Sequence, residues 1–191
     1  MVYPIVAIGD AVLRKKCKVI EPNYAHIDTL INDMFATMYE ASGVGLAAPQ
    51  IGLDIRLFVV DTAPFADDED LSEDEQKILF NLKKVFINPE VIEESGEYWD
   101  FNEGCLSIPN IREDVSRRAR VTIKYQDINF QEYIETYDGL AARVIQHEYD
   151  HIEGILFTDK LSSLKKRLLR KRIQLISSGK VKTDYKMRFP Q

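Results

Sequence analysis

The sequence has few cysteines, few histidines and no long apolar run. Two cysteines, Cys17 and Cys105, are too few for a disulfide framework, so we expect free thiols in a reducing compartment. No stretch approaches the run of about 18 apolar residues that a membrane-spanning helix needs. The first ten residues, MVYPIVAIGD, lack the basic start, apolar core and cleavage site of a secretory signal. These absences predict a cytoplasmic protein with no membrane association.

Neither sign of charge dominates the chain as a whole, which has 25 basic and 31 acidic residues. The net charge of −6 disfavours a protein that binds nucleic acid over its whole surface. The segment ADDEDLSEDEQ is almost purely acidic, however, whereas KKRLLRKR is almost purely basic. A length of 191 residues fits one core of ordinary size. We therefore expect a single catalytic domain over residues 1–191, with an acidic surface insertion at about 64–81 and a basic C-terminal helix and tail at about 162–191.

The spacing of apolar residues predicts three helical segments. They cover Asn23 to Glu40 with Asn23 as the N-cap, a segment from Gly139 onward, and a segment from near Ser163 to Gly179. β-Branched and aromatic content predicts a buried strand in IRLFVVD, and KKVFINPEVI resumes a strand that ends or bends at Pro89. RVTIKYQDI and EYIETYDG alternate like antiparallel strands. The last residues, KVKTDYKMRFPQ, show no period and are expected to be loosely ordered. The fold class is α+β, with mostly antiparallel short strands around a central helix, a long N-terminal helix and a C-terminal helix.

The central helix carries the stretch VIQHEYDHIEG, which has the pattern of a metal site. His147 and His151 stand four residues apart and therefore lie on one helical face, one turn from each other. Glu148 lies at the edge of that face, where its carboxylate reaches a water on the ion without binding the ion. Two of the three histidines in the chain have this spacing, which favours a site over a coincidence.

A catalytic site needs a third protein ligand, and the sequence offers few. No histidine follows His151, and Glu153 is too close on the same helix to complete a tetrahedron. Cys105 lies in NEGCLSIPN, a polar stretch expected before the last strands. Its thiolate would give a Cys-His-His set with a fourth position for water. Cys17 is better interpreted as a small, partly buried residue, and His26 as a surface residue.

The glycine-rich stretch SGVGLAAPQIG is a candidate for binding the charge that develops on an attacked carbonyl. Gly43 and Gly45 allow backbone to approach a ligand closely, and Gln50 carries a neutral amide donor. Taken alone, the pattern is more typical of a turn between a helix and a strand.

Three stretches, GVGLAAPQ, EGCLS and QHEYDH, resemble in order and separation the three motifs of the peptide deformylases. The segment GDAVLRKK also resembles these enzymes, and the similarity extends from about Ile5 to about Leu168. The family removes the formyl group from N-formylmethionine at the start of new bacterial polypeptides and releases formate. The resemblance therefore predicts this activity, with N-formylmethionyl nascent peptides as the partners.

The resemblance also implies roles for individual residues. Cys105, His147 and His151 would hold one divalent ion, and Glu148 would be the general acid and base. The native ion of the family is commonly Fe(II), with Zn, Ni or Co as substitutes, and the ligand set suits several of these ions.

The remaining roles concern the substrate. Gln50 and the backbone N–H of Leu106 would stabilise the oxyanion, and Gly45 would receive the substrate backbone. A pocket for the methionine side chain needs apolar walls, and the resemblance favours Val44 and Leu140 most. The four candidate walls are Val44, Phe101, Leu140 and Val144. From sequence alone, each of them could equally well be an ordinary core residue.

The two charged segments each have two interpretations. The acidic one is a hydrated surface segment or, alternatively, a lid or partner contact. In the basic helix, Leu164, Leu168 and Ile173 would pack inward while lysines and arginines face water. The alternative is a contact with ribosomal RNA through phosphates. We expect a monomer.

Other functional classes are weaker. A zinc peptidase with an H-E-x-x-H helix would need a downstream ligand, which is missing here. A relative that binds metal or peptide without turnover would be expected to lose Glu148 or a ligand, and all are kept. Only the basic helix favours a nucleic-acid-binding protein.

Overall fold

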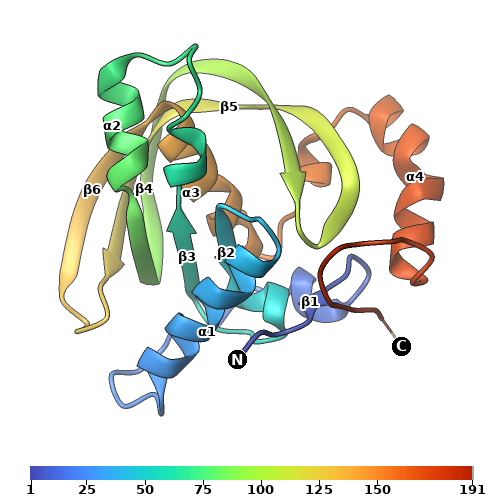
Figure 1. The fold of residues 1–191 in the computed structure, drawn as a ribbon, viewed down its shortest axis with the longest axis horizontal. Coiled ribbons are helices and arrows are strands. Elements are labelled where there is room, and N and C mark those ends of the chain that lie inside the picture. Colours follow the sequence, from blue (N-terminus) through green and yellow to red (C-terminus); the bar gives the residue numbers. More distant parts are fainter. Residues whose placement is uncertain (191) are drawn as a thin grey trace.

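A curved antiparallel sheet forms the frame of the molecule in the computed structural model, which describes residues 1–190 (Figure 1). Its strand order is β2-β3-β4-β5-β6, and β1 pairs in parallel with β7 in a separate two-stranded sheet. The predicted α+β class is confirmed. The strands are β1 Ile5–Val6, β2 Gly45–Ala47, β3 Leu57–Asp61, β4 Lys83–Cys105, β5 Ile108–Gln126, β6 Glu132–Asp138 and β7 Met187–Arg188.

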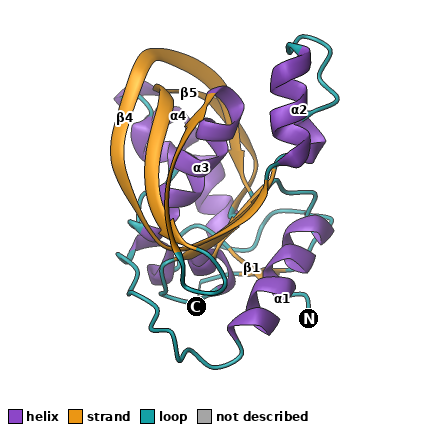
Figure 2. Ribbon diagram, turned by 90° about the vertical axis from the view of Figure 1, so that its left-hand side faces the viewer, coloured by secondary structure: helices purple, strands orange, loops and turns teal. Residues whose placement is uncertain are grey.

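Strands β4 and β5 are much longer than the sequence pattern suggests. They span 23 and 19 residues, and Figure 2 shows them arching beside the central helix α3. Shifts in register bend the pair at four places, the first between Ile87 and Glu90. Pro89 lies in this first shift because it cannot donate to the ladder. Cys105, expected ahead of the strands, is instead the last residue of β4.

Helix α1 begins later than predicted. Its N-cap is His26 in a left-handed conformation (φ 59°) rather than Asn23, whereas its end near Ser42 agrees with the sequence. None of the helices within residues 1–190 is long and apolar enough to cross a membrane. The helices are α1 Ile27–Glu40, α2 Glu73–Asn81, α3 Gly139–Ile152 and α4 Ser163–Ser177.

Helix α3 is the centre of the main core. Ten of its 14 residues are buried, and the helix packs on β2, β3 and β5. Its residue Ile145 shares a buried cluster with the stacked rings of Phe58 and Phe86, whose centroids are 4.6 Å apart. Burial on this scale fixes the position of most of the side chains that α3 carries.

The later part of the acidic segment forms helix α2, which is capped by Ser72. The Glu75 N–H donates to the Ser72 hydroxyl (3.3 Å), and the Glu75 carboxylate accepts from the Ser72 N–H (3.1 Å). Leu79 is the buried residue of α2, while Ile78 and Phe80 are exposed. Helix α2 therefore packs on the rest of the molecule through the face that carries Leu79, and its other faces are exposed.

The packing predicted for the basic helix α4 is wrong at two of its three positions. Leu164 and Leu168 are 57% and 70% exposed, whereas Leu169 and Ile176 are buried and Ile173 is partly buried. Residues 169 and 176 are seven apart and share one helical face, and 164 and 168 lie on another.

The tail after α4 is also more ordered than the sequence predicts. It passes beside the N-terminal segment (Figure 1), where Ile5 N–H donates to the Lys186 carbonyl and Ala7 N–H to the Arg188 carbonyl, both at 2.8 Å. This pairing gives residues 186–188 backbone partners that lie at the other end of the sequence, so no local pattern could reveal it.

Candidate active site

The end of β4 meets helix α3 at a cluster of three ligand-type side chains. The Cys105 sulfur lies 3.3 Å from His151 Nε2, and the ligand atoms of Cys105, His147 and His151 all lie within 4.8 Å of one another. One thiolate and two imidazoles suit Zn²⁺, Fe²⁺ and similar borderline ions, and three protein ligands leave a further position open. The donor set therefore fits a catalytic divalent ion.

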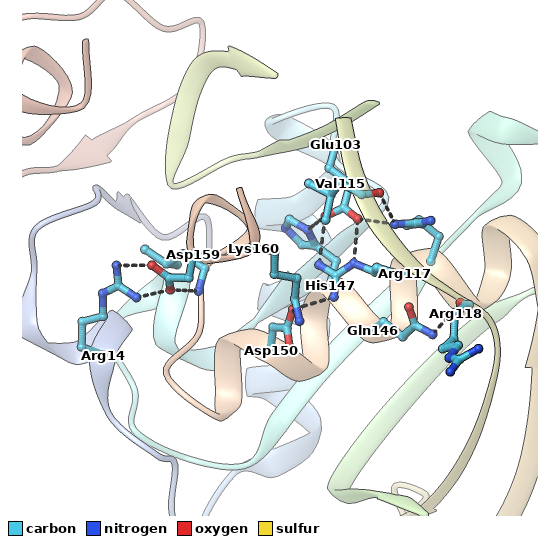
Figure 3. Close-up of polar contacts among 12 residues, drawn as sticks. Arg14, Glu103, Val115, Arg117, Arg118, Gln146, His147, Asp150, Asp159 and Lys160 are labelled. Atoms are coloured by element: carbon cyan, nitrogen blue, oxygen red, sulfur yellow. Dashed lines mark hydrogen bonds and ion pairs between the residues drawn. The ribbon is translucent and has the colours of Figure 1, made fainter. Parts of the chain in front are cut away.

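Both imidazoles present a nitrogen to this cluster. His147 Nδ1 lies 2.9 Å from the Glu103 carboxylate (Figure 3), so its Nε2 is the nitrogen left for the cluster. Burial lowers the pKa of His147, but the Cys105 thiol and Glu103 outweigh it and raise the pKa well above its ordinary value. Burial lowers the pKa of His151 well below its ordinary value, which keeps this ring neutral and able to bind a metal.

Glu103 is the centre of a buried charge network behind His147 (Figure 3). Its carboxylate accepts two hydrogen bonds from Arg117, at 2.7 and 3.0 Å, and one from Arg143 at 2.9 Å. Arg117 also donates to Asp150 at 2.6 Å. Burial raises the pKa of Glu103, but hydrogen bonds from His147 and Arg117 outweigh it and hold that pKa well below its ordinary value. The network therefore keeps a permanent negative charge on the Glu103 carboxylate, which faces His147 Nδ1.

Glu148 points from α3 against the glycine-rich strand β2. It is buried, and within residues 1–190 its Oε2 has no hydrogen-bond partner. Burial raises the pKa of Glu148 to about 7, which is suited to taking and giving a proton near neutral pH. A divalent ion on the ligand trio would lower this pKa. A Cβ on Gly45 would lie 2.4 Å from Glu148 Oε1, so the glycine makes room for the carboxylate.

Gln50 is fixed with its amide donor toward the turn after Cys105. Its Oε1 accepts from the Ala47 N–H at 2.8 Å, which fixes the orientation of the amide. Its Nε2 lies 3.6 Å from the Cys105 sulfur and 3.4 Å from the Ser107 hydroxyl. The side chain is therefore a preorganised donor beside the cluster.

A cavity of about 480 Å³ opens onto these groups. Besides Gln50, Leu106, His147 and Glu148, the cavity is lined by four of the residues predicted to contact substrate, namely Val44, Gly45, Phe101 and Val144. Leu140, also predicted as a wall, does not border this cavity; it lines a smaller cleft with α2. It precedes His147 by seven residues, so a rise of about 1.5 Å per residue places it nearly two turns from the ligands.

Cys17 and His26, which the sequence analysis rejected as metal ligands, lie away from the cluster. Cys17 and Cys105 are free thiols, and burial raises the pKa of Cys17 to about 12, so that its thiol is inert. His26 is exposed at the start of α1.

Several residues around the site escaped the sequence analysis. Glu103 and Asp150 lie inside EGCLS and QHEYDH, so their positions in those motifs were a usable signal. The partners Arg117 and Arg143 carry no such signal. The tail residues Lys182 to Tyr185 also line the cavity, although the sequence predicted only a loosely ordered tail there.

Comparison with known proteins gives one consistent family. The sequence model described as polypeptide deformylase matches residues 2–167. A peptide deformylase of Christiangramia forsetii is 63% identical over 190 residues, covering 100% of this chain and 97% of the relative. One from Flavobacterium johnsoniae is 58% identical over 189 residues, covering 99% and 96%. The crystal structure of peptide deformylase from Thermus thermophilus superposes with a TM-score of 0.80 at 37% identity, covering 93% and 99%.

Proposed function

Because this chain belongs to the polypeptide deformylase family, we propose that Cys105, His147 and His151 hold the metal ion on which that family depends. The protein is an enzyme that removes the N-terminal formyl group from newly synthesised polypeptides. The observation that carries the assignment is the convergence of the three ligand atoms beside the buried Glu148. We infer Fe(II) as the native ion, with Zn, Ni or Co able to replace it.

Glu148 transfers the proton of the reaction. When bound, the ion supplies a lowered pKa for water and polarises the formyl oxygen. Glu148 takes a proton from the attacking water and later gives it to the departing amine. Its position against Gly45, with one oxygen free of protein partners, leaves that oxygen available for this exchange. The products are formate and a free amino terminus.

The negative charge of the tetrahedral intermediate is held by two donors of this chain. The first is the Gln50 amide, whose orientation is fixed before substrate arrives by the Ala47 N–H. The second is the backbone N–H of Leu106, in the turn directly after Cys105. Both line the cavity that Glu148 borders.

The same cavity receives the formylmethionyl end of the substrate. Val44, Phe101 and Val144 are apolar walls for the methionine side chain, and Gly45 lies where the substrate backbone approaches most closely. The enzyme acts on nascent chains in the cytoplasm as a monomer.

Release of formate from formyl-Met-Ala-Ser tests these roles. Glu148→Ala should retain the metal and lose about 10²- to 10⁴-fold in rate, because it removes the proton carrier. The exposed Glu132 gives a matched control, and Glu132→Ala should behave as the parent. Full activity of the Glu148 variant would contradict the assignment. Loading the enzyme with iron under anaerobic conditions, and with zinc in parallel, tests the choice of ion.

The basic helix α4 supports a contact with ribosomal RNA. Arg167 and Lys171 are exposed and lie one turn apart, so they present charge on one face. Because residues beyond α4 pair with β1, reversing these charges is a cleaner test than deleting the helix. The double change R167E/K171E should weaken co-sedimentation with ribosomes at low salt and leave formate release unchanged. Unaltered co-sedimentation of the double variant at low salt would refute the proposed contact between α4 and ribosomal RNA.

A further inference from the structure

The turn that carries the Leu106 N–H is a two-residue loop between β4 and β5. Cys105 pairs with Ile108, so Leu106 and Ser107 form the loop and lie outside the ladder. The loop is held at Ser107, whose carbonyl accepts from the Ile8 N–H (2.9 Å) and whose hydroxyl faces Gln50 (3.4 Å). Neither of these contacts fixes the Leu106 carbonyl.

The C-terminal tail supplies that contact. The Tyr185 hydroxyl donates to the Leu106 carbonyl at 2.8 Å. Tyr185 is half-buried. Burial is the main cause that raises its pKa, and the nearby Cys105 raises it further, so the phenol keeps its proton and remains a donor. The next residue, Lys186, accepts from Ile5 N–H in the β1–β7 pairing, and the Thr183 hydroxyl donates to the Tyr185 carbonyl (2.8 Å). The tyrosine is therefore held on both sides.

We propose that Tyr185 is a positioning residue, whose hydroxyl fixes the Leu106 loop so that the Leu106 N–H stays directed at the oxyanion. The N–H and the carbonyl of Leu106 flank a single φ/ψ pair, so restraining the carbonyl restrains the donor. The β1–β7 sheet acts on both loop residues, since Ile8 follows β1 and Tyr185 precedes β7. The inference rests on the proposed role of Leu106 and adds the tail to the site.

The position of the tail agrees with this role. Residues 182–185 line the cavity that contains Gln50 and Glu148, so the tyrosine acts at the reaction chamber rather than at a remote surface. The Leu106 side chain is confined as well, because a Cβ on Gly43 would lie 2.8 Å from its Cδ1. Because the Leu106 side chain is packed, the main motion left to this residue is rotation of its peptide plane. The hydrogen bond from the Tyr185 hydroxyl restrains that rotation.

Tyr185→Phe in the full-length, metal-loaded enzyme tests the proposal, because it removes the hydroxyl and keeps the ring. We expect kcat for formyl-Met-Ala-Ser to fall about tenfold, with KM and metal content unchanged, because ground-state contacts remain. Tyr133→Phe is the matched control: its hydroxyl contacts the Gln131 side chain and lies outside the cavity lining. That variant should retain the parental kcat.

Three results would overturn the proposal: a kcat for Tyr185→Phe within about twofold of the parent, a loss confined to KM, or a loss that follows metal content. If that variant does not fold, Thr183→Val removes the hydroxyl that donates to the Tyr185 carbonyl, loosens the same tail and should lower kcat in the same direction. An unchanged kcat for this second variant would also count against the idea. An inactive parent enzyme would instead refute the proposed function, so the two failures are distinguishable.

Discussion

Replacing Glu103 by glutamine is the most informative single change outside the metal ligands. Glutamine keeps the shape of the side chain and removes its charge. The carboxylate accepts four hydrogen bonds, two from Arg117 and one each from Arg143 and His147. The variant therefore removes the anion that faces the buried guanidinium groups of Arg117 and Arg143. It also places an amide NH₂, which is a donor, among groups that are themselves donors.

The expected loss of stability follows from the partners that remain. Removing one member of a buried ion pair costs about 3–5 kcal/mol. Arg117 keeps Asp150, and Arg143 keeps the carbonyls of Trp99 and Val115, so we expect the lower end of that range, about 3 kcal/mol. Because the Glu103 carboxylate also orients His147, metal affinity should fall about 10- to 100-fold.

Urea unfolding of the metal-free proteins and metal titration of the folded ones measure the two effects. The control is Glu113→Gln, which breaks the more exposed pair with Lys165 (2.9 Å) and should cost at most about 1 kcal/mol. A loss below about 1 kcal/mol for Glu103→Gln, with metal affinity within about twofold of the parent, would refute the reasoning.

The same variant should change the response to acid. The pKa of Glu103 is depressed in the folded chain, so its contribution is fully present above the unfolded value of about 4.3 and is lost as pH falls through the lower folded value. The stability difference between parent and Glu103→Gln should therefore narrow as the pH falls below about 4. A difference that stays constant down to about pH 2.5 would contradict the assigned charge state.

Further changes test single contacts. Gly45→Ala should displace the Glu148 carboxylate, because the added methyl would lie 2.4 Å from it, and lower kcat/KM at least about tenfold without loss of metal; a fully active variant would show that the carboxylate can move freely. Cys105→Ser should lower metal occupancy, as elemental analysis of the purified variant would reveal, since a hydroxyl is a poorer ligand than a thiolate. Leu168→Lys should alter the free energy of unfolding by no more than about 0.5 kcal/mol, because Leu168 is 70% exposed; a larger loss would mean that the leucine is covered in solution.

Local patterns predicted the part of the site that lies on one element. His147, Glu148 and His151 follow from the 3.6-residue period of a single helix. Cys105 was identified by eliminating the few other candidate ligands and from the resemblance of the motifs.

What the sequence could not provide depends on pairing between distant segments. The network of Glu103 with Arg117 and Arg143 joins two long strands and a helix, and no local period encodes their register. Tyr185 reaches Leu106 because β7 pairs with β1, which joins segments more than 180 residues apart. The inward face of α4 was misjudged because the leucines at 168 and 169 are neighbours, and composition does not say which of two adjacent leucines faces the core.

The placement of Cys105 at the end of β4, opposite His151 on α3, has a consequence for how the chain unfolds. The two residues are 46 apart in sequence, and their contact exists only after the hairpin has closed over the helix. An ion bound between them would act as a removable cross-link, since an unfolded chain would have to close that long loop to keep it. Ion binding would then stabilise the folded chain by a free energy that rises with the logarithm of the free ion concentration. A chelator should therefore lower resistance to heat and to proteases as well as abolish turnover.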